Sequence, residues 1–70
     1  MSNHDKLVRM ANQIAQNLMM QPHDQAVAGV VEHLRAFWTP RMRQQIMDHA
    51  ASGGAGLEPL TREAVARLAG

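Results

Sequence analysis

The clearest helix boundary in this chain lies in the stretch Arg35-Ala36-Phe37-Trp38-Thr39-Pro40-Arg41-Met42-Arg43. Thr39 is a favourable N-cap residue, because its side-chain oxygen can accept a hydrogen bond from a backbone N–H of the following turn. Pro40 suits the first helical position, where the N–H that proline lacks would have no partner. The stretch therefore predicts that one helix ends near Trp38 and that another begins at Pro40.

Upstream of this boundary the apolar residues recur at a helical period, and no part of the chain alternates as a strand would. Residues 24–38 are predicted to be helical, with Asp24 as a possible N-cap after a break at Pro22, which disfavours helix for the preceding residue. The predicted inner face of this helix is made of Ala26, Val27, Val30, Val31, Leu34, Phe37 and Trp38. Gly29 lies off that face, where a close approach by another backbone is one explanation.

Residues 4–20 form the predicted first helix, in which Ser2 is a fair N-cap and Asp5 supplies an acidic first turn. Its apolar stripe comprises Leu7, Met10, Ala11, Ile14 and Leu18, widened by Val8, Ala15 and Met19. An apolar arc of that width indicates contacts on two sides, since a surface helix needs only about 100°.

Two shorter helices are predicted downstream, over residues 40–51 and 59–69. Gly53 suits the left-handed residue that ends the first of them, and Glu58 followed by Pro59 repeats the device of a cap before a proline. Glu63 and Arg67 are spaced for an ion pair along the last helix. The whole pattern predicts an all-α fold, a single domain over residues 1–70 with three main helices and a short C-terminal one.

Composition limits the possible functions of a chain this small. It has 70 residues, a net charge of +1 and no cysteine, so disulfides and thiolate metal sites are excluded. Proteins of this size usually need disulfides, a metal or a partner to be stable. A net charge this close to zero does not favour binding to nucleic acid or to membranes. Stabilisation by a partner protein is the remaining common route.

No apolar run approaches the roughly 20 residues that span a bilayer. Residues 1–6 also lack the basic-then-apolar order of a secretory signal. We therefore expect a cytoplasmic protein.

No catalytic or metal-binding constellation is recognisable. The four histidines, His4, His23, His33 and His49, show no metal-site spacing, although His33 and His49 could contact each other. Residues 53–56, Gly-Gly-Ala-Gly, follow no strand and precede no Lys-Ser or Lys-Thr, so a turn is favoured over a phosphate loop. We predict no catalytic, cofactor-binding or metal-binding residue in this chain.

The corner around Trp38 is the best candidate for a binding surface, since interfaces are enriched in Trp, Arg and Met. Consecutive Phe37 and Trp38 point about 100° apart on a helix. Both are internal only if the corner is covered; otherwise one is buried and the other faces a partner. The candidate partner-binding residues are Arg35, Phe37, Trp38, Pro40, Arg41, Met42 and Arg43. A small DNA-binding regulator is a weaker alternative, because a recognition helix needs a clearer basic face.

Three blocks resemble the delta subunit family of the soluble, NAD-dependent, molybdenum-containing formate dehydrogenases. They are Leu7-Val8-Arg9-Met10-Ala11-Asn12-Gln13-Ile14-Ala15, His33-Leu34-Arg35-Ala36-Phe37-Trp38-Thr39-Pro40-Arg41-Met42-Arg43, and the glycine turn leading to Leu57-Glu58-Pro59-Leu60. The Phe-Trp-x-Pro-Arg-Met run within the second block is the most specific.

The resemblance implies a non-catalytic accessory subunit that binds the large alpha subunit and supports its assembly or stability. A transient chaperone for assembly or cofactor insertion is the alternative. The resemblance also implies that molybdenum pterin, iron–sulfur clusters and FMN lie in the other subunits and not in this chain. No nucleic acid or membrane is expected as a partner, and the isolated chain could self-associate through its wide apolar faces.

Overall fold

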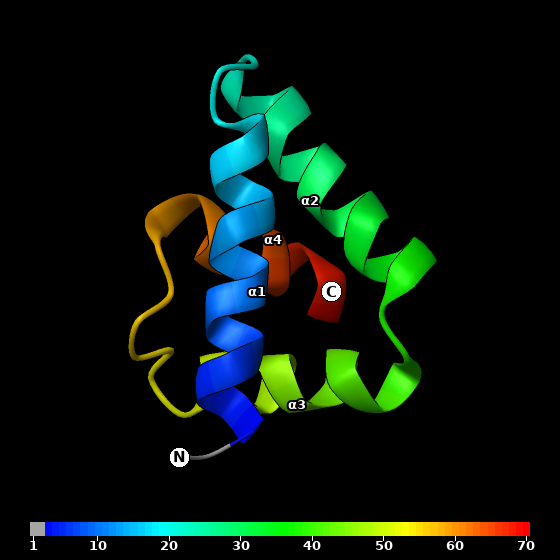
Figure 1. Ribbon diagram of the computed structural model, residues 1–70, viewed down its shortest axis with the longest axis vertical. Coiled ribbons are helices and arrows are strands. Elements are labelled where there is room, and N and C mark those ends of the chain that lie inside the picture. The colour runs from blue at the N-terminus through cyan, green and yellow to red at the C-terminus, as the bar shows by residue number, and fades with distance from the viewer. Residues whose placement is uncertain (1–2) are drawn as a thin grey trace.

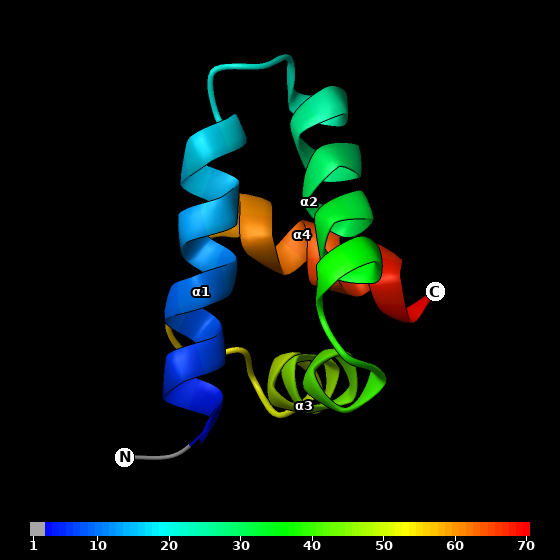
Figure 2. The ribbon, with the colours of Figure 1, turned by 45° about the vertical axis from the view of Figure 1, so that its right-hand side comes forward.

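The computed structural model describes residues 3–70, and they form four α-helices. These are α1 (Asn3–Leu18), α2 (His23–Phe37), α3 (Pro40–Ala51) and α4 (Pro59–Ala69). Helices α1 and α2 run antiparallel, α3 crosses beneath them, and α4 packs against all three (Figures 1 and 2). The described residues contain no strand, so the predicted all-α class is confirmed.

The helix ends follow the prolines. Helices α3 and α4 occupy the ranges predicted for them, whereas α1 ends at Leu18 and not at residue 20. The chain turns there, with the N–H of Gln21 donating to the carbonyl of Leu18 at 3.0 Å. Pro22, next in the chain, disfavours a helical conformation at Gln21. The expected cap at Ser2 lies outside the described residues.

The predicted cap at Asp24 is wrong. Pro22 holds the N-cap position of α2, no side chain caps this end, and Asp24 lies inside the first turn. A carboxylate there still interacts favourably with the positive end of the helix dipole. The predicted cap at Thr39 is confirmed, because its Oγ1 accepts a hydrogen bond from the N–H of Met42 at 3.1 Å.

The fourth helix begins without a side-chain cap. Glu58 holds the N-cap position of α4 but makes no capping hydrogen bond there. Its carboxylate accepts instead from the Nε2 of Gln16 on α1, at 3.1 Å. At the end of α3, Gly53 has the positive φ, 117°, that was predicted for it.

All four helices contribute to one core. Its buried members are Leu7, Val8, Ala11, Ala15, Val27, Val30, Val31, Leu34, Trp38, Ile46, Leu57, Ala64 and Val65. Helix α1 packs against α2, α3 and α4, as its wide apolar arc predicted. The close neighbour of Gly29 is a side chain and not the backbone suggested from the sequence, because a Cβ at Gly29 would lie 3.0 Å from Cδ1 of Leu18. Within the described residues, every helix is too short or too polar to cross a membrane.

Candidate protein interface around helix α2

The two aromatic residues of the corner divide between the inside and the outside. Trp38 is only 5% exposed and belongs to the core, whereas Phe37 is 73% exposed. The backbone is extended at Trp38, which ends α2 and turns this side chain inward. The ring of Phe37 rests on the ring of His33, with 4.7 Å between their centroids. Of the alternatives drawn from the sequence, the structure selects the one with one internal and one external aromatic.

Arg43 is engaged within the chain. Its Nη1 donates to the carbonyls of Trp38 at 2.6 Å, Arg35 at 3.2 Å and Leu34 at 3.5 Å. The last carbonyls of a helix have no intrahelical partner, and a basic side chain is well suited to bind them. Arg43 therefore holds the C-terminal end of α2 against the start of α3.

The remaining predicted residues do not gather at one place. Pro40 and Arg41 are exposed at the start of α3. Met42 packs against the core and lines a hollow of about 250 Å³ between α1 and α3, together with Leu7 and Met10. Arg35 lines a different hollow, between α2 and α4. The seven residues predicted as one binding surface therefore do not form a single surface, and their partner-binding role stays a prediction.

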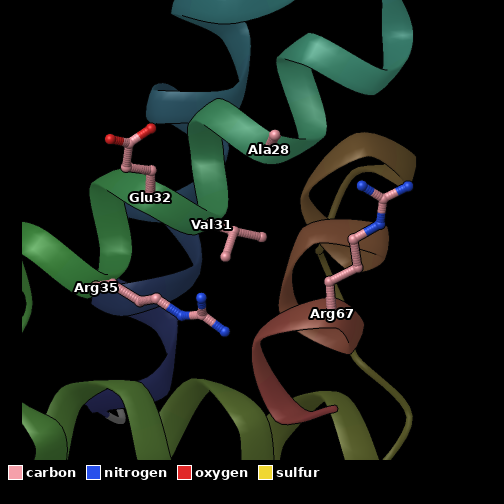
Figure 3. A pocket seen from close by; sticks show the side chains of 5 residues that line it. All are labelled: Ala28, Val31, Glu32, Arg35 and Arg67. Atoms are coloured by element: carbon pink, nitrogen blue, oxygen red, sulfur yellow. The ribbon is translucent and has the colours of Figure 1, made fainter.

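A groove separates the outer sides of α2 and α4. The hollow has a volume of about 440 Å³ and is lined by Ala28, Val31, Glu32, Arg35 and Arg67 (Figure 3). The side chain of Arg35 extends from α2 toward the gap, and Arg67 borders it from α4. The carboxylate of Glu32 points away from α4.

The sequence did not identify Arg67 as a candidate binding residue, because its spacing from Glu63 predicts an ion pair between these two side chains. The structure gives both side chains partners on α2 instead. Oε2 of Glu63 lies 2.7 Å from Nε2 of His23, and Nη2 of Arg67 lies 3.9 Å from Oδ1 of Asp24. These contacts link elements far apart in the sequence, so spacing along a single helix contains no signal for them.

A second exposed apolar site lies at the turn between α1 and α2. Met19 and Met20 are 63% and 92% exposed there. Met19 also borders a hollow of about 270 Å³ whose wall includes Leu60 at the start of α4. The sequence placed Met19 on the apolar stripe of the first helix, but α1 ends one residue before it.

Residues 53–56, the glycine loop, are fixed by side chains of this chain. Arg62 donates to the carbonyls of Gly53 and Gly54, at 3.0 and 3.1 Å. The Nδ2 of Asn12 donates to the carbonyl of Gly56 at 2.9 Å. Its Oδ1 accepts from the N–H of Glu58, the N-cap residue of α4, at 3.1 Å. The loop is therefore a structural connection, as the sequence suggested.

The histidines take separate partners. His49 meets His4 edge-on with 5.4 Å between ring centroids, and its Nε2 lies 2.8 Å from the carbonyl oxygen of Ala55. The suggested contact between His33 and His49 is replaced by these pairings, since His33 stacks on Phe37. Over residues 3–70, no three His, Asp or Glu side chains come together in a group that could hold a metal ion.

Comparison with known proteins gives one result. The family model described as NADH-dependent formate dehydrogenase delta subunit FdsD matches residues 6–65. No curated protein and no solved structure matches the chain. The matched range includes the corner around Trp38, the groove residue Arg35 and the whole glycine loop.

Proposed function

Since this chain belongs to the delta subunit family of the NADH-dependent formate dehydrogenases, we propose that it is a non-catalytic accessory subunit of such an enzyme. In this role it binds the large alpha subunit in the cytoplasm and supports the assembly or stability of that subunit. The family match over residues 6–65 is the observation that carries the proposal. Molybdenum pterin, iron–sulfur clusters and FMN are then held by other subunits. The lack of cysteine supports this, because protein thiolates are the usual ligands of iron–sulfur clusters.

The exposed apolar side chains support a role in binding a protein. Phe37 exposes 73% of its surface, although the next residue, Trp38, is buried in the core. The ring of Phe37 lies against that of His33, and burying an exposed phenylalanine contributes about 1.5–3 kcal/mol. The exposed Met19 and Met20 offer a further adaptable contact, since methionine fits irregular surfaces well.

Co-expression of the tagged chain with the other subunits tests the proposal. We expect the chain to co-purify in fixed stoichiometry with active formate dehydrogenase. Phe37→Ala should weaken this association by about 2 kcal/mol or more, because a central aromatic is a typical hot spot. Gln13→Ala is the matched control, since Gln13 is exposed on α1 and its side chain donates to Asn17 of the same helix.

Three outcomes separate the possible roles. A chain present in the mature, active enzyme supports a permanent subunit. A chain bound to immature alpha subunit and absent from the mature enzyme indicates the transient chaperone. Association at neither stage would refute the proposal.

A further inference from the structure

We propose that the groove between α2 and α4 docks an acidic segment of the partner chain, with Arg35 and Arg67 binding its carboxylate. This inference rests on the proposed function and names the surface through which the chain acts. The groove takes Arg35 from the corner around Trp38, but Phe37 is not among the residues that line it. It is therefore a second contact region, separate from that aromatic.

The two arginines are available for an external partner. Arg35 makes no ion pair with any described residue. Among the described residues Arg67 pairs with Asp24 at 3.9 Å, but the side chain of Asp24 is 90% exposed to solvent. An exposed pair at that distance contributes little, so its replacement by a better acceptor costs little.

The lining of the groove carries two arginines and one glutamate, and therefore a net positive charge. Glu32 lines the hollow, yet its carboxylate points away from α4 and from the guanidinium of Arg67 (Figure 3). Asp24 is at the N-terminal end of α2. The carboxylate of Glu63 on α4 contacts His23, with Oε2 of Glu63 2.7 Å from Nε2 of His23. The guanidinium groups of Arg35 and Arg67 are therefore the charges that a group seated over Val31 would meet.

The floor of the groove suits a protein segment better than a free ion. Val31 and Ala28 supply apolar surface beneath the two arginines. A segment with an apolar residue beside an Asp or Glu would cover that floor and exclude water, which strengthens an arginine–carboxylate bond. Arginine also holds carboxylates in a planar, two-bond geometry that lysine does not provide. The volume of about 440 Å³ accommodates a few side chains of such a segment.

Titration of delta-free formate dehydrogenase with the labelled chain tests this docking site. Arg35→Glu and Arg67→Glu should each raise the dissociation constant at least about tenfold. Arg9→Glu, the same charge change at an exposed position of α1, should change it no more than about twofold. Raising the salt from roughly 50 to 300 mM should weaken wild-type binding more than that of either groove variant. Far-UV circular dichroism checks that each variant folds, and the Arg→Gln change at the same position replaces any Glu variant that does not.

Zero-length carbodiimide coupling identifies the occupant in the assembled enzyme. The amine introduced by Arg35→Lys or Arg67→Lys should become linked to an Asp or Glu of the alpha subunit. Arg9→Lys gives the background. Linkage to a second copy of this chain, or no linkage above background, would overturn the assigned occupant.

The result also separates this inference from the proposed function. If the wild-type chain binds the enzyme and both groove variants bind equally well, the groove is not the docking site and the proposed function stands. If the wild-type chain does not bind at all, the proposed function fails, and the assigned occupant fails with it.

Discussion

Replacing Trp38 with alanine should remove much of the folding free energy, whereas the same change at the adjacent Phe37 should not. The two residues are neighbours at one helix end and differ chiefly in burial, 5% against 73% exposed. The pair therefore compares a core aromatic with a surface aromatic in nearly the same sequence context. Sequence alone left both positions as candidates for either role.

The size of the effect at Trp38 follows from its burial. A buried tryptophan removes about 200 Å² from water, which at about 25 cal/mol per Å² amounts to about 5 kcal/mol. Truncation of core tryptophans to alanine typically costs about 3–5 kcal/mol. A 70-residue domain has a total stability of about 4–10 kcal/mol. Trp38→Ala should thus remove about a third or more of the folding free energy of the isolated chain. Phe37→Ala, a surface change, should stay within about 0.5 kcal/mol of the wild type.

Guanidinium unfolding of the isolated chain, followed by far-UV circular dichroism, measures both variants against the wild type. Binding to delta-free enzyme is measured in parallel. We expect Phe37→Ala to keep the unfolding midpoint and to lose binding. If Trp38→Ala instead keeps the wild-type midpoint while binding is lost, Trp38 is an interface anchor and its place in the core is wrong.

Three further changes test the contacts that hold the helices together. Arg43→Met should lower the unfolding free energy by about 1–3 kcal/mol, because it removes the donor that Arg43 gives to the carbonyls of Arg35 and Trp38. Arg41→Met, at an exposed position, should have little effect. Thr61→Val should raise the free energy of unfolding by up to about 1 kcal/mol, since the buried hydroxyl of Thr61 has no hydrogen-bond partner among residues 3–70. A loss of stability would show that the hydroxyl is satisfied. Asn12→Ala should cost about 1–2 kcal/mol and speed amide exchange in the glycine loop, which Asn12 anchors; Gln13→Ala should leave that exchange unchanged.

Most helix boundaries were predictable because they depend on a few adjacent residues. Thr39 caps α3 with its own hydroxyl, and Pro40 and Pro59 both stand at a first helical position. The prediction failed at the start of α2, where Asp24 was expected to act as the cap. There the neighbouring Pro22 holds the N-cap position, and α2 begins with His23, which contacts Glu63 on α4.

The candidate interface was harder to predict, because side chains adjacent in sequence have different surroundings in space. Arg43 and Arg41 are two residues apart, yet one binds the carbonyl ends of α2 and the other is exposed. Arg67 borders the groove opposite Arg35 only because α4 packs against α2. A single sequence contains no record of that packing.

The sequence by itself determined the all-α class, the break before Thr39 and the resemblance to the delta subunit family. Each of these depends on residue identity, apolar period or caps within one turn, which are local properties of the chain. Only the tertiary structure decided that Trp38 is internal and Phe37 external, and that Arg35 faces α4. Those outcomes depend on how four helices share one core, because burial is a property of the packed assembly and not of any single helix.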